Sequence, residues 1–441
     1  SLCVILCLLA GVGQAKPLFR DLSHRLPEHR YLGGWNHFVG GGITVMDCNG
    51  DTLPDIFAAG GTGPAGLFVN QGNFTFAARP LPNIRASTGS YPIDINADGF
   101  IDLFVLRIGQ NMILKGGPDC SFTLAKAEFA LPPTDQWSTA FSAWWEDDGR
   151  PHMAIGNYVD LKNPEGPFFA CDSHEILTPR SDGYQSTSLN PGFCSLSVLA
   201  TKDATGALRL RISNDRQYYV RGGNEQMWDL KERRFLDASD GWEKISIWGM
   251  GIASRDITGD QREEVMLTSM GDQLMQIAQP DGSYTNAPFS IGTYAHRPYF
   301  GDDGRPSTGW HAQFGDLDND GRADLFISKG NVDQMPSNAI KDPNNLLMQQ
   351  ADGTFQEMGQ TAGLASTERG RGAALVDFDG DGRLDVLVLN RRAPLQIYRN
   401  ETPDTGHWLA VSLMQPGGNR HAIGASVTVN GDMQRAIIGG G

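Results

Sequence analysis

Five stretches of the sequence carry oxygen-bearing side chains at positions 1, 3, 5 and 9 of a glycine-containing segment. Side chains at this spacing converge on one point when the chain turns tightly, and carboxylate oxygens are ligands that Ca²⁺ prefers. Without a cation, three or four carboxylates so close together would repel one another strongly. We therefore expect about five Ca²⁺ ions, one for each stretch. The predicted ligands are Asp47, Asn49, Asp51 and Asp55; Asp94, Asn96, Asp98 and Asp102; Asp256, Thr258, Asp260 and Glu264; Asp316, Asp318, Asp320 and Asp324; and Asp377, Asp379, Asp381 and Asp385.

EF-hands share the first half of this spacing, but they need a bidentate Glu at position 12 and flanking helices. Position 12 is apolar in all five stretches, where it is Ala58, Val105, Leu267, Ile327 or Val388. The EF-hand is therefore rejected, and each stretch is expected to be a loop between two β-strands. Plain Asx and glycine turns without a metal remain the alternative. Five copies in register favour Ca²⁺, in a structural role rather than as a switch.

The five stretches belong to a longer internal repeat with seven copies. The copies begin at residues 47, 94, 144, 201, 256, 316 and 377, with an average spacing of 55 residues. An apolar or glycine-rich segment precedes each copy, and an apolar run follows it. Two copies have lost the acidic pattern and are called decayed here: Trp144 and Thr201 occupy the position of the first Asp. No metal is expected in those two.

Three or four short strands in each of seven repeats predict an all-β fold, namely a seven-bladed β-propeller with four-stranded blades. Closing the ring hides the sheet edges that a linear array of the same repeats would expose. The propeller is assigned to residues 16–400. Residues 16–46 are expected to supply the strand that completes the ring.

The beginning of the chain has the features of a signal peptide. Residues 2–12 form an apolar run that is too short for a membrane span, and a small-x-small site follows at residues 13–15. Residues 1–15 are therefore predicted to be a signal peptide that is incomplete at its start. The mature protein is expected to be secreted, periplasmic or on the cell surface, without a membrane span.

Cysteine usage agrees with an oxidising compartment. Cys171 and Cys194 close a 22-residue segment and are expected to form a disulfide. Whether Cys48 and Cys120 pair or stay free is left open.

Composition excludes some classes of function. The 441 residues include 51 acidic and 36 basic side chains, which gives a net charge of −15. A nucleic-acid-binding protein needs a cationic surface, so nucleic acid is not an expected partner. Apolar residues make up 40% of the chain, which is typical of a folded protein, and 54 glycines suit a fold with many tight turns.

The acidic loops resemble the FG-GAP/VCBS repeats of integrin-α-type propellers, and the chain as a whole is similar to the family of cartilage acidic protein and its bacterial relatives. Outside the loops, the resemblance includes residues 156–159, 213–215 and 250–253, and Trp310. Residues 406–412, 419–425 and 439–441 are similar to the opening of the ASPIC/UnbV domain, so residues 401–441 are assigned to the truncated beginning of this small β-rich domain. The resemblance implies a secreted, calcium-binding propeller used in extracellular interaction, with no established catalytic chemistry.

A search for an active site finds no HExxH, GxSxG or P-loop motif. An enzyme using the propeller channel, such as a polysaccharide lyase or hydrolase, would need residues such as His296, Arg297 and His311 to converge there. Several tryptophans could form a sugar-binding platform, although packing between blades is the favoured interpretation. These are Trp137, Trp144, Trp145, Trp228, Trp242, Trp248 and Trp310.

The favoured function is a non-enzymatic, exported, calcium-binding scaffold for adhesion or binding, whose partner is an extracellular protein or glycan. The insert at residues 157–200 is the predicted recognition surface, because long stapled loops on rigid scaffolds tend to carry binding. An extracellular polysaccharide lyase or hydrolase and a structural subunit of a surface complex remain the alternatives.

Overall fold

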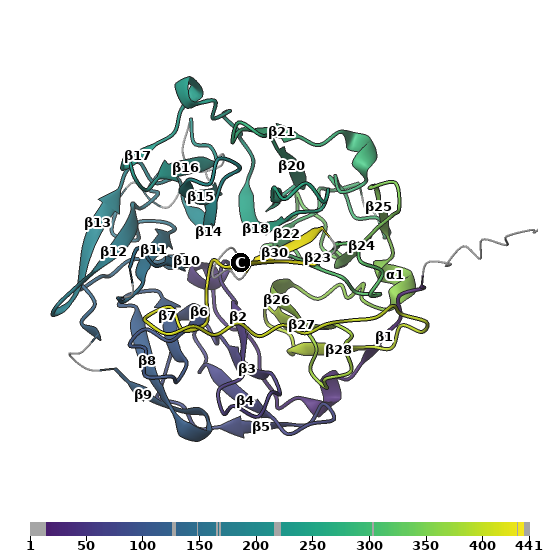
Figure 1. Cartoon of the computed structure of the whole chain (residues 1–441), viewed down its shortest axis with the longest axis horizontal. Helices are drawn as coiled ribbons and strands as arrows, with labels where there is room; N and C mark the ends of the chain where they lie inside the picture. The colour runs from purple at the N-terminus through teal and green to yellow at the C-terminus, as the bar shows by residue number, and fades with distance from the viewer. Residues whose placement is uncertain are drawn as a thin grey trace, which may run out of the picture.

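The computed structural model describes residues 15–125, 129–147, 149–164, 166, 169–215, 222–301, 304–429 and 431–435. Seven four-stranded antiparallel sheets stand around a central axis (Figure 1). The predicted all-β, seven-bladed propeller is therefore confirmed. The predicted signal peptide lies outside the described residues except for Ala15, as do residues 439–441 of the C-terminal resemblance.

Each blade is a meander of four strands, numbered here from the axis outward. Blade 1 comprises β2 (Ile43–Met46), β3 (Asp55–Ala58), β4 (Gly66–Asn70) and β5 (Phe76–Arg79); blade 2 comprises β6 (Ser87–Ile93), β7 (Asp102–Arg107), β8 (Met112–Gly117) and β9 (Ser121–Leu124). Blade 3 comprises β10 (Ser138–Trp144), β11 (His152–Asn157), β12 (His174–Arg180) and β13 (Gly183–Leu189); blade 4 comprises β14 (Ser195–Lys202), β15 (Leu208–Asn214), β16 (Gln226–Asp229) and β17 (Arg234–Phe235). Blade 5 comprises β18 (Gly249–Arg255), β19 (Glu264–Ser269), β20 (Leu274–Ala278) and β21 (Tyr284–Asn286); blade 6 comprises β22 (Gly309–Gly315), β23 (Asp324–Lys329), β24 (Asn345–Gln349) and β25 (Phe355–Glu357). Blade 7 comprises β26 (Gly370–Val376), β27 (Asp385–Asn390), β28 (Gln396–Asn400) and β1 (Phe19–Asp21).

Helices are short and lie in the connections. Among the described residues they are α1 (Gly359–Ala362) and the 3₁₀ turns η1 (Ser23–Arg25), η2 (Trp35–His37), η3 (Pro118–Cys120), η5 (Ala238–Asp240) and η6 (Phe289–Ile291). A two-stranded hairpin, β29 (Ser426–Val429) with β30 (Asp432–Arg435), follows the propeller.

The second strand of a blade is an uninterrupted apolar run because neighbouring blades cover both of its faces. In β7, the side chains of Leu103, Phe104, Val105 and Leu106 are fully buried. The core therefore consists of layers between blades, which fill the space around the axis. This packing explains why the repeat shows apolar runs rather than the alternation of a half-exposed strand.

The N-terminal strand closes the ring, as expected for residues 16–46. β1 pairs antiparallel with β28, with Phe19 opposite Asn400 and Asp21 opposite Tyr398. Phe19 is buried in the core between blades 6 and 7, where Tyr398 also lies. Blade 7 thus combines the two ends of the propeller domain in one sheet, in which β1 covers the outer edge of β28.

The two ends of the propeller differ. Because each blade is a meander, the turns between strands 1 and 2 and between strands 3 and 4 share one end, which we call the loop face. At the other end, residues 33–40 cover the mouth of the channel, so we call it the plug face. Phe38 of this plug contacts the rings of Trp137 and Tyr158 edge-on, with centroids 6.0 and 5.8 Å away.

Two disulfides link neighbouring blades. Cys171 bonds Cys194, the pair expected from the sequence, and joins the long loop of blade 3 to the start of blade 4. Cys48 bonds Cys120, a pairing that the sequence left open, and joins the first loop of blade 1 to blade 2. Both bonds thus reinforce contacts between blades.

Replacing Phe19 by Ala should lower the free energy of unfolding by about 3 kcal/mol, because it empties part of the core where the ring closes. Leu18→Ala is the matched control: its side chain is 48% exposed, so the loss should stay below about 0.5 kcal/mol. Urea unfolding followed by tryptophan fluorescence measures both. Equal losses in the two variants would contradict a closure that depends on β1.

Candidate metal sites

All five predicted loops lie on the loop face, each between strands 1 and 2 of its blade, in blades 1, 2, 5, 6 and 7. In every case the ninth-position acid begins strand 2 and pairs across the sheet with the residue that precedes the first-position Asp. The pairs are Met46 with Asp55, Ile93 with Asp102, Arg255 with Glu264, Gly315 with Asp324, and Val376 with Asp385. The common register explains why the spacing recurs so regularly.

The first-position Asp shapes its loop by accepting backbone hydrogen bonds. In blade 7, Oδ1 of Asp377 accepts from Gly380 N at 2.8 Å and Asp381 N at 3.1 Å, and Oδ2 accepts from Gly382 N at 2.8 Å. The same bonding recurs, with two or three donors, at Asp47, Asp94, Asp256 and Asp316. This carboxylate therefore holds the loop in a conformation that brings the later side chains together.

The ninth-position acid ties the loop to the outer part of its blade. Asp385 accepts from Phe378 N at 2.9 Å with one oxygen and from Asn400 N, at the end of strand 3, at 2.8 Å with the other. Asp55, Asp102 and Asp324 make the equivalent pair of bonds. Glu264 accepts only from Ile257 N, and its buried Oε1 has no partner among the described residues.

Burial raises the pKa of these ninth-position acids, and the neighbouring loop aspartates raise it further. The pKa is about 6 for Asp55, about 7 for Asp102 and Glu264, and about 8 for Asp385. The charged form of each group is therefore disfavoured in the folded protein unless a cation balances it.

The loop of blade 6 is the strongest candidate for a metal site. Asp318 is 1% exposed, and neither of its carboxylate oxygens has a hydrogen-bond partner among the described residues. Asp316, Asp318 and Asp320 each offer an oxygen, and these oxygens lie within 4.8 Å of one another. Burial and the charges of Asp320 and Asp316 raise the pKa of Asp318 to about 7. A buried, unpaired carboxylate beside two others fits a hard divalent cation.

The loop of blade 7 forms a second such group, made by Asp377, Asp379 and Asp385. Here one oxygen of Asp379 has no partner, while the other pairs with Arg399 at 2.8 Å. In blades 1, 2 and 5 the described side chains do not bring three carboxylates so close together. Asn49 and Asn96 instead donate to the fifth-position carboxylates Asp51 and Asp98, at 2.8 and 2.9 Å.

A third group of possible ligands is not a metal site. Cys48, Cys120 and Asp55 lie close together, but the two sulfur atoms are joined in a disulfide and offer no thiolate.

Sequence reasoning missed an arginine at position 7 of three loops. Arg262, Arg322 and Arg383 turn back and form ion pairs with the fifth-position carboxylates of their own loops. The signal was present, because Arg follows position 6 in blades 5, 6 and 7. These pairs neutralise part of the charge of each of the three loops, and in blade 6 they leave Asp318 as the carboxylate without a partner among the described residues.

The segment after the propeller lies across the loop face. In Figure 1 it runs from blade 7 across the face to β7 and returns to the axis, where β29 and β30 lie. Gly406 N donates to the carbonyl of Asp318 at 3.2 Å, and Trp408 lies directly against Gly382. Farther along, Asn419 and His421 line a cavity together with Asp94. The segment therefore contacts the loops of blades 6, 7 and 2, which the sequence did not predict.

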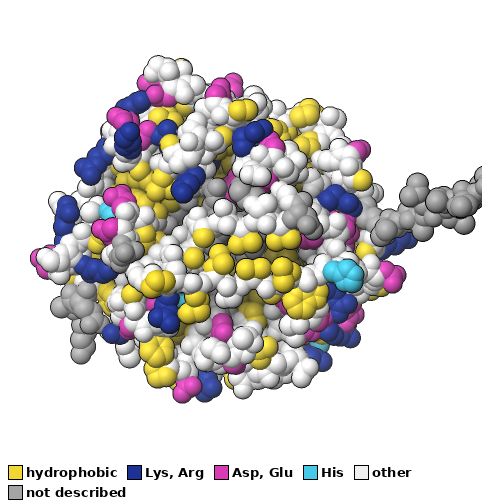
Figure 2. All heavy atoms as spheres, viewed as in Figure 1, with side chains coloured by type: hydrophobic (Ala, Val, Ile, Leu, Met, Phe, Trp, Pro, Cys, Tyr) yellow, Lys and Arg dark blue, Asp and Glu magenta, His cyan; other side chains and the backbone are white. Residues whose placement is uncertain are grey.

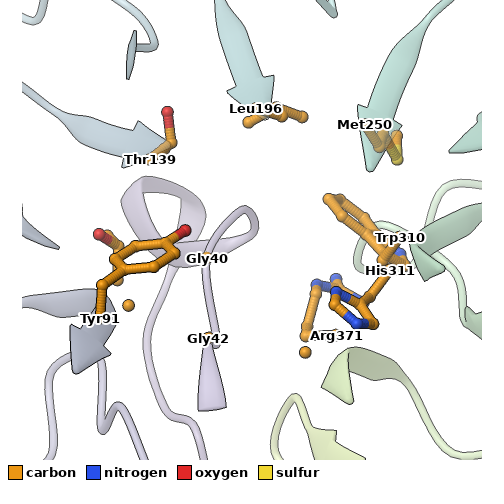
Figure 3. A pocket seen from close by; sticks show the side chains of 12 residues that line it. Gly40, Gly42, Tyr91, Thr139, Leu196, Met250, Trp310, His311 and Arg371 are labelled. Atoms are coloured by element: carbon orange, nitrogen blue, oxygen red, sulfur yellow. The ribbon is translucent and has the colours of Figure 1, made fainter. Parts of the chain in front are cut away.

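The central channel is lined by the first strands of all seven blades. Figure 3 shows Tyr91 on one side of it and His311, Arg371 and Trp310 on the other. The Arg371 guanidinium stacks on the Trp310 ring, 3.8 Å from its centroid, and donates to four backbone carbonyls, including those of Phe38 and Val332. Burial lowers the pKa of His311 to about 4, so this imidazole is neutral at pH 7.

The residues proposed for a catalytic set do not form one site. His311 faces the channel, whereas His296 and Arg297 are exposed and His296 Nδ1 bonds Asp272 at 2.6 Å. The seven tryptophans considered as a sugar platform are buried or half-buried, which agrees with packing between blades.

A family model for the FG-GAP-like repeat matches residues 47–105 and 337–388. The chain carries FG-GAP-like repeats. Cartilage acidic protein 1 of mouse and of human is 28% identical over 99 residues, which are 22% of this chain and 15% of either relative. The match thus spans well under two thirds of those relatives' length. It supports the resemblance to the cartilage acidic protein and ASPIC/UnbV family.

Among solved structures, two crystal structures of BBS1N in complex with ARL6DN are similar to this chain, with a TM-score of 0.52 and 10% identity. The alignments cover 89% of this chain and 99% or 100% of the other. At this identity the likeness concerns the propeller fold alone. Within the described residues, no helix has the length and hydrophobicity needed to cross a membrane.

In excess EGTA, the melting temperature should fall as the pH rises from 7.5 to 8.5. Asp102, Glu264 and Asp385 have folded-state pKa values of about 7 to 8, so the folded protein holds protons in this window that the unfolded chain has already released. The window lies above the usual pKa of histidine, so buried neutral histidines do not contribute.

Asp385→Asn removes one of these groups and should make the decline shallower. Differential scanning calorimetry at matched ionic strength measures both profiles. A flat or rising profile for the metal-free wild type would contradict the assignment.

Proposed function

We propose that the protein is an exported, calcium-stabilised propeller that binds a protein or glycan partner without catalysing a reaction. The observation that carries the calcium part is Asp318, whose carboxylate is buried and unpaired between Asp316 and Asp320. Leaving such a charge without a partner would cost several kcal/mol. A bound divalent cation removes this cost, and Ca²⁺ suits a site built from carboxylate oxygens.

The five loops differ in how well their side chains suit Ca²⁺. Blades 6 and 7 each offer three carboxylates that lie close together, whereas blades 1, 2 and 5 offer the same spacing with an amide or a hydroxyl at position 3. The third-position carboxylates Asp318 and Asp379 are the proposed central ligands, joined by Asp316 and Asp320 in blade 6 and by Asp377 and Asp385 in blade 7. When bound, the ion would neutralise the loop and tie strand 1 to strand 2.

Export is supported by the two disulfides, since such bonds persist in oxidising compartments. It agrees with the signal peptide predicted for residues 1–15. The domain boundaries also remain proposals, with the propeller at 16–400 and the beginning of an ASPIC/UnbV-like domain at 401–441.

The plug face is the proposed recognition surface. The loop face is covered in part by the C-terminal segment, whose apolar side chains form a band across its centre (Figure 2). Long connections gather instead at the plug face, and their described residues are 158–164, 166, 169–173, 287–301, 304–308 and 330–344. Trp35 and Phe169 are exposed there, at 44% and 68%. Aromatic side chains on long loops above a rigid scaffold suit protein or glycan binding.

The fold agrees with this use. BBS1N, whose structure has a similar fold, was solved in complex with ARL6DN, and this supports a protein partner for the present chain. In the present chain, residues 33–40 cover one mouth of the channel, and Arg371 uses its guanidinium in bonds to backbone carbonyls. These features favour a scaffold over an enzyme that works in the channel.

Replacing Asp318 by Asn tests the calcium proposal, because the resulting change in melting temperature should differ in direction with and without calcium. In saturating Ca²⁺ the variant should melt at a lower temperature than the wild type, because a ligand is lost. In EGTA it should melt at the same or a higher temperature, because an unpaired buried charge is gone.

Asp352→Asn is the matched control, since Asp352 lies in an exposed turn of the same blade on the same face and should have little effect in either condition. Thermal unfolding of all three proteins with Ca²⁺ and with EGTA measures the effect. The proposal fails if the wild type melts identically in both conditions, or if Asp318→Asn costs the same in both.

A further inference from the structure

The two decayed repeats, in blades 3 and 4, carry a base where the other five carry an acid. The ninth position is His152 in blade 3 and Arg209 in blade 4, and each pairs across the sheet with its first-position residue, Trp144 or Thr201. In the five blades whose loops carry the predicted metal ligands, the ninth position instead pairs with the residue before the first position. The hairpins of the two decayed repeats are therefore tighter. In blade 4, only residues 203–207 lie between the paired Lys202 and Leu208.

Arg209 lies between two carboxylates that each hold a turn. Its Nε donates to Oδ2 of Asp203 at 3.0 Å, and its Nη1 forms an ion pair with Asp229. Asp203 Oδ1 accepts backbone hydrogen bonds in the turn between strands 1 and 2, from Thr205 N at 2.9 Å and Ala207 N at 3.1 Å. The side chain of Arg209 thus reaches the acid that shapes the loop.

The second carboxylate belongs to the turn between strands 3 and 4. Asp229 Oδ1 accepts from Lys231 N and Glu232 N, both at 2.8 Å. The side chains of Arg209, Asp203 and Asp229 are 16%, 8% and 9% exposed, so water screens the charges only weakly. Arg209 therefore links the two turns on the loop face of blade 4.

In blades 1, 2, 6 and 7 the ninth-position acid links the same two parts of the blade, but it accepts hydrogen bonds where Arg209 donates them. In blade 7, Asp385 accepts from backbone N–H groups of its loop and of the end of strand 3. In blade 4, Arg209 donates to carboxylates in the two corresponding turns. The position is the same, but the charge is reversed and the cation is part of the chain.

We propose that Arg209 acts as a built-in cation that takes the place of the metal, so that blade 4 is held together independently of calcium. The proposal rests on calcium binding in the other loops only for its contrast between blades. Blade 3 has no such cation, because burial lowers the pKa of His152 and leaves its imidazole neutral at pH 7. The ring stacks on Trp144 instead, with centroids 5.6 Å apart.

The consequence is a propeller with two sectors. Blades 3 and 4 are neighbours, the Cys171–Cys194 disulfide joins them, and neither needs a metal ion. Blades 5, 6, 7, 1 and 2 form the calcium-dependent sector. The described residues of the long loop of blade 3, namely 158–164, 166 and 169–173, are part of the proposed recognition surface. They belong to the metal-independent sector formed by blades 3 and 4 and keep their support when calcium is withdrawn.

Arg209→Met keeps most of the side-chain volume and removes the charge. It should lower the melting temperature by roughly 5 °C, by the same amount in Ca²⁺ and in EGTA, and leave the number of bound Ca²⁺ ions unchanged. Arg262→Met is the matched control, because Arg262 pairs with an acid inside one of the five loops that carry the predicted metal ligands. Arg262→Met should lower the melting temperature by less than Arg209→Met does, and by different amounts in Ca²⁺ and in EGTA.

Hydrogen exchange of the wild-type protein gives the second readout. On adding EGTA, exchange should rise severalfold at residues 47–54, 94–101, 256–263, 316–323 and 377–384, and stay unchanged at residues 203–207. If Arg209→Met does not fold, the milder Asp229→Asn variant takes its place, with the same expectation.

Three outcomes would overturn the proposal. They are a fall in the melting temperature of Arg209→Met that appears only with Ca²⁺, one additional Ca²⁺ ion bound by this variant, and faster exchange at residues 203–207 of the wild type in EGTA. If exchange in EGTA is unchanged everywhere while Arg209→Met still costs the same in both conditions, the link made by Arg209 stands and the calcium function fails. The two claims are thus separable.

Discussion

Like-charge repulsion on the loop face is the constraint on which the rest of the molecule depends. Each of the five loops carries three or four acidic side chains where strands 1 and 2 meet, and those of blades 6 and 7 bring three carboxylates close together. The ninth-position acid is buried there because it begins strand 2. Three kinds of interaction reduce this repulsion. Backbone N–H groups hold the first and ninth positions, position-7 arginines pair with the fifth, and the proposed calcium ion balances the third, as at Asp318. Blade 4 balances its acids with Arg209 instead.

The same loops support what lies on them. Gly406 bonds the carbonyl of Asp318 and Trp408 rests on Gly382, so the C-terminal segment depends on the shape of the loops in blades 6 and 7. The plug face has a different basis, since Arg371 and Arg391 hold residues 33–40 through backbone carbonyls. Calcium would thus govern the face that carries the C-terminal segment and leave the opposite face available for a partner.

Much of the fold could be predicted from the sequence, because a repeat of closely similar units encodes its own architecture. The spacing of the acids, the apolar run after each loop and the seven starting points determined the blades and the placement of the loops. Contacts between distant segments could not be predicted. Neither the position-7 pairs nor the link from Arg209 to Asp229 follows from spacing, since each depends on where a long side chain turns. The Cys48–Cys120 bond and the path of the C-terminal segment likewise depend on which blades become neighbours in the ring.

Native mass spectrometry of the calcium-equilibrated protein, with the bound ions counted per chain, tests the central claim most directly. The loops of blades 1, 2, 5, 6 and 7 predict five Ca²⁺ ions, the weaker of them lost first as free calcium falls and those in blades 6 and 7 lost last. A chain that carries no Ca²⁺ at millimolar concentration would contradict the account. So would a count of seven, because it would place ions in blades 3 and 4, where His152 and Arg209 stand at the ninth position.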